Sequence, residues 1–215
     1  MKTNLTWIVM VLDKSGSMSS IKSDVIGSFN TFINEQKKVE GEASASLLLF
    51  DSKMNQVYEN VNIKEIQKLN ESTYVPSNCT ALYDAIGTSL KSTKEKIKIL
   101  SDEQKPESVI FVIITDGMEN SSHIYNKEYV FNKIKKREEK DSWKFIYMGA
   151  NQSAYAEGGK IGIKKFNTVT YTPDSNGIKV AFASANTYTT NYRNSKDKAN
   201  FNQDLNQIYK EEESK

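Results

Sequence analysis

The chain has 215 residues, enough for one large domain or two small ones, and its 38% hydrophobic and 26% charged residues are typical of a soluble globular protein. Lysine plus arginine total 29 and aspartate plus glutamate total 27, and no basic cluster is interleaved with aromatic residues, so we expect no nucleic-acid binding. The N-terminal residues lack a secretory pattern, and the apolar run at 7–12 is too short to span a bilayer. The single cysteine, Cys79, cannot form an internal disulfide, which fits a reducing compartment. We therefore expect a cytoplasmic protein, and the short apolar run leads us to expect no membrane contact.

Four apolar runs predict buried parallel strands. Runs of this length, rich in β-branched residues, are typical of strands that helices cover on both faces. The four are residues 5–12, 45–50, 109–114 and 143–148. A short edge strand is predicted at 54–61, after a turn, and a short last strand at 167–171.

Apolar side chains at helical spacing lie between these strands and predict helices. The predicted helices cover about residues 21–33, 82–97, 127–140 and 175–192. This alternation predicts an α/β doubly wound sheet, mostly parallel with one antiparallel edge strand, and with helices on both faces. In such sheets ligands bind beyond the carboxyl ends of the strands, where the strand order reverses.

The chain is expected to form one domain over residues 1–193, followed by a polar tail at 194–215. Within the tail, Phe201, Leu205 and Ile208 mark one face of a helix. We expect this helix to pack on the domain. A helix that docks on a partner is the alternative.

Oxygen-bearing side chains after three separate elements predict a metal site. Asp13, Ser15 and Ser17 follow the first strand, Thr80 opens a helix, and Asp116 ends another strand. A set without histidine or cysteine favours Mg²⁺, Mn²⁺ or Ca²⁺, and near-octahedral geometry favours Mg²⁺ or Mn²⁺. Because hydroxyls are neutral ligands, the cation would stay electrophilic toward an outside carboxylate.

Each motif alone has an ordinary structural explanation. An Asp-x-Ser sequence after a strand is often a helix N-cap, as is a lone threonine such as Thr80. Asp116 followed by Gly117 is a common turn. Three such motifs on separate strand-end loops of one alternating fold argue together for a shared site.

Three segments resemble the loops of a von Willebrand factor type A domain that carries a metal-ion-dependent adhesion site, in its small stand-alone bacterial and phage form. They are Asp-Lys-Ser-Gly-Ser-Met at 13–18, Thr-Ala-Leu-Tyr-Asp-Ala at 80–85 and Ile-Thr-Asp-Gly at 114–117. The resemblance covers about residues 1–193. It implies that the metal is usually Mg²⁺, and that the family's usual task is protein binding. It also implies that Ser15, Ser17 and Thr80 touch the metal, while Asp13 and Asp116 bind it directly or through water.

The predicted function is therefore a Mg²⁺-dependent protein-binding module without enzymatic activity. Its metal would capture an Asp or Glu side chain of a partner protein, and the oligomeric state is left open. The surrounding loops supply a predicted partner-binding rim: Lys14, Met18, Asn78, Met118, Glu119, Asn120 and Asn151.

Two rival functions remain open. One is a Mg²⁺-dependent hydrolase or phosphotransferase with Asp13 as nucleophile, although such enzymes usually have a second acid where Ser15 stands. The other is an assembly protein in which the metal only pins three loops together. An EF-hand is excluded, since it needs glycine at Met18 and glutamate at Asp24, and the sequence has neither a P-loop nor a Gly-x-Ser-x-Gly elbow. The only histidine, His123, is expected in an exposed loop.

Overall fold

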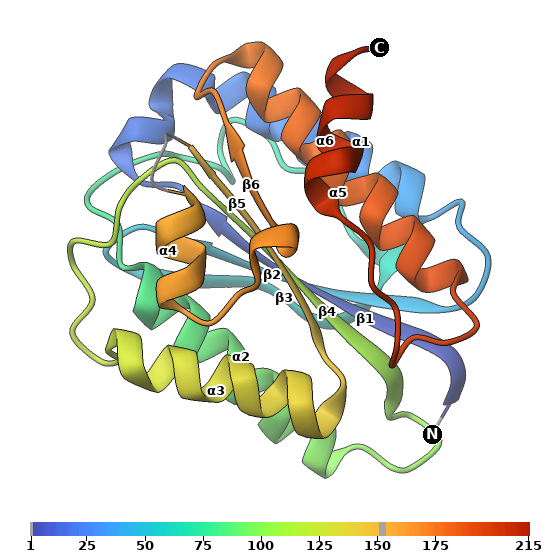
Figure 1. Cartoon of the computed structure of the whole chain (residues 1–215). Helices are drawn as coiled ribbons and strands as arrows, with labels where there is room; N and C mark the ends of the chain where they lie inside the picture. The colour runs from blue at the N-terminus through green and yellow to red at the C-terminus, as the bar shows by residue number, and fades with distance from the viewer. Residues whose placement is uncertain (1, 151–153) are drawn as a thin grey trace.

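A computed structural model describes residues 2–150 and 154–215 and shows a three-layer α/β structure with a six-stranded sheet in the middle (Figure 1). The strand order is β3-β2-β1-β4-β5-β6. Every neighbouring pair is parallel except β2 with β3, which places one antiparallel strand at the edge. The strands are β1 (Lys2–Asp13), β2 (Ala43–Phe50), β3 (Met54–Asn62), β4 (Pro106–Thr115), β5 (Lys144–Ala150) and β6 (Thr168–Tyr171). The predicted fold class is confirmed.

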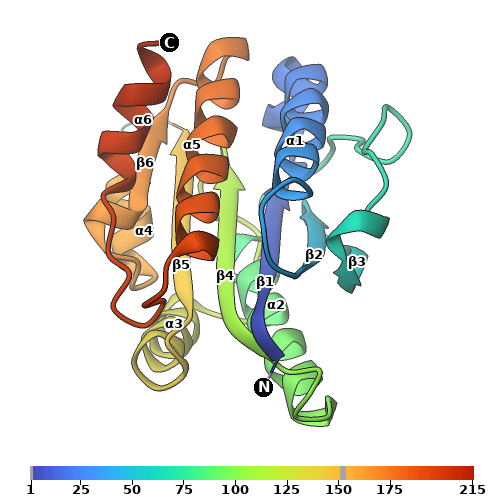
Figure 2. The same ribbon diagram turned by 90° about the vertical axis from the view of Figure 1, so that its right-hand side faces the viewer.

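Helices cover both faces of the sheet (Figure 2). One face carries α1 (Lys22–Gln36), α5 (Ser175–Asn194) and α6 (Leu205–Glu213). The other carries α2 (Leu82–Ile99) and α3 (Lys127–Asp141), with the short α4 (Ala154–Lys160) beside β5 and β6. None of the helices in the described ranges is long and apolar enough to cross a membrane.

The central strand β1 shows why the apolar runs carry no alternation. Ile8, Met10 and Leu12 enter the core under α1 and α5, whereas Trp7 and Val9 enter the core under α2 and α3. Both sets of side chains are almost completely removed from solvent. A strand with two buried faces has no polar side to present, and this explains its continuous apolar sequence.

The C-terminal tail contributes to the core. Leu205 and Ile208 of α6 are buried in the same cluster as the inner face of α5. Phe201 precedes α6, and its ring lies edge-on to Tyr188 and Tyr192 of α5, with centroids 5.3 Å apart in each case. These contacts fasten the tail along α5 and the edge of the sheet.

Candidate metal centre

The site lies where the strand order reverses. β2 pairs with one side of β1 and β4 with the other, so chain connections leave the carboxyl end of the sheet in opposite directions there. Leu12 is in register with Ile114, which brings Asp13 beside Thr115. The Thr115 hydroxyl donates to Asp13 Oδ2 at 2.5 Å. The end of β1 is thereby tied to the end of β4.

A short 3₁₀ helix (Gly16–Ile21) follows β1 and brings the Ser17 hydroxyl to Asp116, directly after β4. The Ser15 backbone amide donates to Asp13 Oδ1 at 2.6 Å, which holds the carboxylate in place. The Ser15 and Ser17 hydroxyl oxygens are 3.1 Å apart, and the Ser17 hydroxyl donates to Asp116 Oδ1 at 2.6 Å. Four of the five predicted metal ligands therefore form one connected chain of contacts.

Thr80, the fifth predicted ligand, lies against the loop that carries Asp116. A Cβ atom added to Gly117 would fall 2.6 Å from Thr80 Oγ1, so only glycine allows this approach. Asn120 fixes the backbone of Thr80. The Asn120 side-chain oxygen accepts from the Thr80 backbone amide at 2.8 Å, and the Asn120 backbone amide donates to the Thr80 carbonyl at 3.0 Å. The Asp116 loop and the start of α2 are thus joined through Thr80.

Both carboxyl groups have pKa values raised above the ordinary value of an aspartate. Asp13 is completely buried, and burial raises the pKa of its carboxyl to about 6 despite the hydrogen bonds from Thr115 and Ser15. The nearby charge of Asp116 raises that pKa further. Burial also raises the pKa of Asp116, against the hydrogen bond from Ser17. Two buried acids of like charge, linked through hydroxyls, make an environment that a cation stabilises.

The donor set fits a hard divalent cation. It offers two carboxylates and three hydroxyls, all oxygen, which suits Mg²⁺, Mn²⁺ or Ca²⁺ better than a metal that prefers nitrogen or sulfur. In the described part of the chain no group of three or more His, Cys, Asp or Glu side chains could hold a metal ion. A cation at this site would therefore depend on the hydroxyls of Ser15, Ser17 and Thr80.

Lys14 and Asn78, predicted at the rim, both contact Asp51 at the end of β2. The ammonium of Lys14 lies 2.5 Å from Asp51 Oδ2, and the Asn78 amide donates to the same oxygen at 3.1 Å. Burial would raise the pKa of Asp51, but hydrogen bonds from Lys14, Ser77 and the Lys53 amide outweigh it and lower the pKa to about 2. This ion pair braces the loop at 13–18 against β2.

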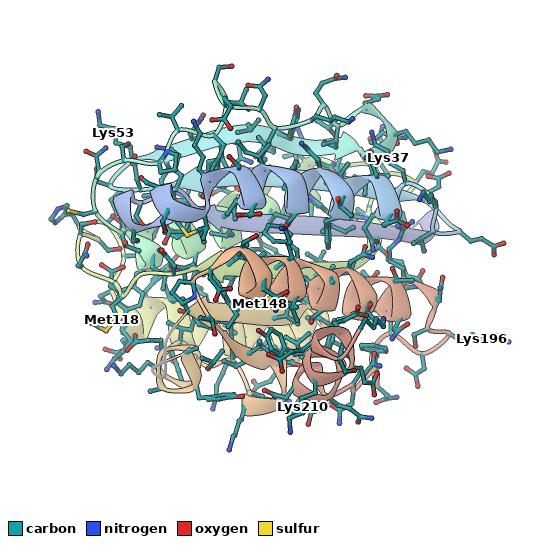
Figure 3. The ribbon with its side chains drawn as sticks, turned by 90° about the horizontal axis from the view of Figure 1, so that it is seen from above. Lys37, Lys53, Met118, Met148, Lys196 and Lys210 are labelled. Atoms are coloured by element: carbon teal, nitrogen blue, oxygen red, sulfur yellow. The ribbon has the colours of Figure 1, made fainter. Side chains whose placement is uncertain are left out.

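The other rim residues occupy different settings. Met18 is wrong as a rim residue: it is 0% exposed and packs in the core with Ile21 and Val25, because the 3₁₀ helix turns it inward. Met118 is 64% exposed, and Figure 3 places it at one end of the molecule. Asn120 is also exposed. Asn151 lies outside the described residues.

Glu119 and an unpredicted residue, Asp84, organise the loop that follows Asp116. Glu119 accepts from the amides of Tyr83, Ser121 and Ser122 and from the Ser122 hydroxyl. Asp84, in the first turn of α2, accepts from three successive backbone amides at 2.7–2.9 Å: those of His123, Ile124 and Tyr125. An acid in the first turn of a helix usually indicates only a favourable interaction with the helix dipole. Sequence alone therefore does not reveal that Asp84 holds the loop at 123–125.

No family model matches the sequence, and no curated protein matches it. Solved structures do resemble the chain. Proximal thread matrix protein 1 from the mussel byssus superposes with a TM-score of 0.59 at 12% identity, covering 86% of this chain and 46% of that chain. The ArnB paralog VWA2 from Sulfolobus acidocaldarius superposes with a TM-score of 0.54 at 18% identity, covering 86% of this chain and 45% of that chain. The chain has the fold of a von Willebrand factor type A domain.

A second structure of the mussel protein is described as having a zinc-occupied metal-ion-dependent adhesion site, and it superposes with a TM-score of 0.53 at 14% identity, covering 83% of this chain and 46% of that chain. The present chain spans about half the length of these type A structures. At such low identities the likeness shows the fold alone. The function of this chain therefore follows only from its own residues.

Proposed function

We propose that this chain is a Mg²⁺-dependent protein-binding module whose metal centre captures an Asp or Glu side chain of a partner. The proposal rests on one observation. Asp13, Ser15, Ser17 and Asp116 form a continuous chain of contacts of 2.6–3.1 Å, and Thr80 adjoins it at Gly117. The zinc-occupied site named for a protein of the same fold supports a divalent cation at this place.

The charge balance supports capture of a third carboxylate. Asp13 and Asp116 together match the charge of one divalent cation, while the three hydroxyls add ligands without adding charge. A bound Mg²⁺ supplies a Lewis-acidic position that an acidic side chain from outside can fill. Ser17 is exposed whereas Asp13 is buried, so the set opens to solvent on the side of Ser17. Any acidic ligand would approach from there.

Binding without turnover is part of the proposal. A phosphotransferase that used Asp13 would need a cation to hold the transferred phosphoryl group. The cation adjacent in sequence, Lys14, is committed to Asp51 by an ion pair. The Asp13 carboxylate is itself completely buried and receives hydrogen bonds on both oxygens, an arrangement that suits a fixed ligand better than an attacking nucleophile.

The first experiment measures the metal alone. Mg²⁺ is titrated into the metal-free protein by calorimetry, in parallel with a thermal melt. Ser17→Ala removes the hydroxyl that bridges to Asp116 and should weaken Mg²⁺ binding by about tenfold, equivalent to roughly 1.4 kcal/mol. Ser19→Ala is the matched control, because Ser19 is exposed in the same 3₁₀ helix and should leave binding unchanged. Equal Mg²⁺ affinity in the two variants would show that Ser17 is not a ligand and would contradict the proposed metal centre.

The second experiment tests carboxylate capture. Partners retained from a lysate in Mg²⁺ are compared with those retained in EDTA, and with those retained by Asp116→Asn in Mg²⁺. The partner should be lost in both of the latter, and substitution of its contacting acid by the amide should abolish binding. A partner that holds equally well in EDTA would favour a purely structural metal. Release of phosphate from a generic ester, abolished by Asp13→Asn, would favour the enzyme.

A further inference from the structure

A groove between α2 and α3 concentrates positive charge. The two helices lie side by side on the same face of the sheet (Figure 1). The groove has a volume of about 260 Å³ and is lined by six cations, one acid and two other side chains. Its lining residues are Lys91, Lys94, Lys98, Lys133, Lys136, Arg137, Glu95, Leu90 and Tyr129. Since the whole chain carries a net charge of only +2, this is a marked local excess.

The cations of the groove are mostly not neutralised by the chain itself. Asp141 of α3 pairs with Lys94 at 3.2 Å and also with Arg137. Within the described ranges the remaining four lysines form no ion pair: Lys91, Lys98, Lys133 and Lys136. Lys91 lies in the middle of α2, where the helix dipole gives no reason for a cation. Asp141 shows that a carboxylate can be held by cations from both helices at once.

The setting of Tyr129 favours an acidic protein segment over nucleic acid as the anionic partner. Its ring stacks on Tyr125 with centroids 4.7 Å apart, and the Lys133 ammonium lies 5.0 Å from its centroid. With the ring engaged by both neighbours, the groove offers no free aromatic face on which a nucleic-acid base could stack. The span from Lys91 to Lys98 is about 10 Å along the helix axis, which matches two turns of an acidic helix better than a long phosphate backbone.

We propose that this groove is a second docking surface, which takes a segment of a partner protein rich in glutamate or aspartate. It does not depend on the metal centre. α2 begins at Leu82, next to the metal-site residue Thr80, and Lys91 lies roughly 13 Å further along the helix. A partner with an acidic segment could therefore contact the groove and the metal centre together, and the two contacts would reinforce each other through effective concentration.

The test uses the full chain in EDTA, so that the metal centre does not contribute. The probe is a short fluorescent alanine-rich peptide with glutamates spaced three and four residues apart, so that they share one helical face. Its anisotropy is followed at low salt and at roughly 0.15 M salt. The double variant Lys91→Glu with Lys133→Glu reverses one cation on each helix and should weaken binding at least tenfold. Its matched control is Lys68→Glu with Lys196→Glu, which changes the net charge equally at exposed positions outside the groove.

Three outcomes would overturn the proposal. The peptide could fail to bind even at low salt. The groove variant and the control could weaken binding equally, which would show a nonspecific effect of net charge. A duplex DNA probe could bind the groove more tightly than the peptide, which would assign the surface to nucleic acid instead. Circular dichroism of each variant checks that the fold is retained, since Lys68, Lys91 and Lys196 are exposed but Lys133 is half-buried.

Discussion

Ser17 and Asp116 are 99 positions apart in the chain, yet the Ser17 hydroxyl donates to Asp116 Oδ1 at 2.6 Å. This contact closes the gap between the loop after β1 and the loop after β4. In the type A fold these two loops leave the sheet at the point where its strand order reverses. The hydrogen bond is made by two groups that we propose as metal ligands. A bound cation would replace it with two coordinate bonds.

The close approach of Gly117 to Thr80 yields the first prediction. In Gly117→Ala the new methyl group would lie 2.6 Å from Thr80 Oγ1 and would push this hydroxyl away from Asp116. We expect Mg²⁺ affinity to fall by about tenfold, and the free energy of unfolding to fall by roughly 1–3 kcal/mol. Calorimetric titration and urea denaturation measure the two effects.

Gly27→Ala is the matched control for that substitution. Gly27 lies within α1, and a Cβ atom there would meet nothing within 4 Å. Alanine is favoured over glycine inside a helix by roughly 0.5–1 kcal/mol, so this variant should be more stable and should bind Mg²⁺ as the parent does. If Gly117→Ala also kept its full affinity, Thr80 would not belong to the metal centre.

Asp13 makes the stability of the metal-free protein depend on pH. Its pKa is raised from 3.8 to about 6, so the folded state holds a proton that the unfolded state releases between these values. As pH rises through this window the free energy of unfolding should fall, by roughly 3 kcal/mol for such a shift. Asp13→Asn lacks the titrating group. The difference between its unfolding free energy and that of the parent in EDTA, measured from about pH 4 to about pH 7, isolates this contribution.

Mg²⁺ should reverse that loss, because it binds the ionised carboxylate and competes with the proton. The increase in melting temperature produced by Mg²⁺ should be small below about pH 5 and large above pH 6, where Asp13 is ionised. An increase that is independent of pH over this range would place the cation away from Asp13. A stabilisation retained in Asp13→Asn would indicate the same.

Much of this fold could be predicted from the sequence, because the apolar runs of a sheet buried on both faces are unmistakable. β1 and β4 lie where such runs end in Asp13 and Thr115, and the edge strand β3 was predicted at 54–61 because it follows a turn. α4 was missed. It has only seven residues, two of which are Gly158 and Gly159, so its local helix propensity is low.

The side chains around the metal centre were harder to predict than its ligands. Ligand residues follow strand ends, and strand ends can be located by pattern. Whether a neighbouring charged group faces solvent depends on partners far away in the chain. Lys14 forms an ion pair with Asp51, Glu119 accepts a hydrogen bond from the Tyr83 amide, and Met18 packs in the core. None of these contacts has a local signal in the sequence.

Asp84 carries a prediction about the loop after Asp116. Its carboxylate accepts from the amides of His123, Ile124 and Tyr125, and hydrogen bonds to a charged acceptor contribute about 1.5–3 kcal/mol each. Asp84→Asn keeps the shape but loses the charge and places an NH₂ group against a donor. We expect a loss of roughly 2–3 kcal/mol in unfolding free energy. Faster hydrogen exchange at residues 117–126 should accompany it.

The control for that variant is Glu59→Gln, which changes an exposed acid on β3 and should alter the free energy of unfolding by less than about 0.5 kcal/mol. Weaker Mg²⁺ binding in Asp84→Asn at a temperature where the protein is folded would show that the loop positions Asp116. Unchanged binding together with faster exchange would separate the loop from the metal centre.

The last prediction concerns α6 and tests whether this helix is part of the cooperatively folded core or docks on it reversibly. Leu205 is 0% exposed and lies in the core with Tyr188 and Tyr192 of α5. Leu205→Ala should lower the free energy of unfolding by about 2–5 kcal/mol in a single cooperative transition, since a buried leucine is lost and a cavity remains. Glu211→Ala, on the exposed side of α6, should have little effect. If α6 instead docks reversibly, Leu205→Ala should leave the main transition unchanged and increase hydrogen exchange only after residue 200, because the rest of the core would stay intact without it.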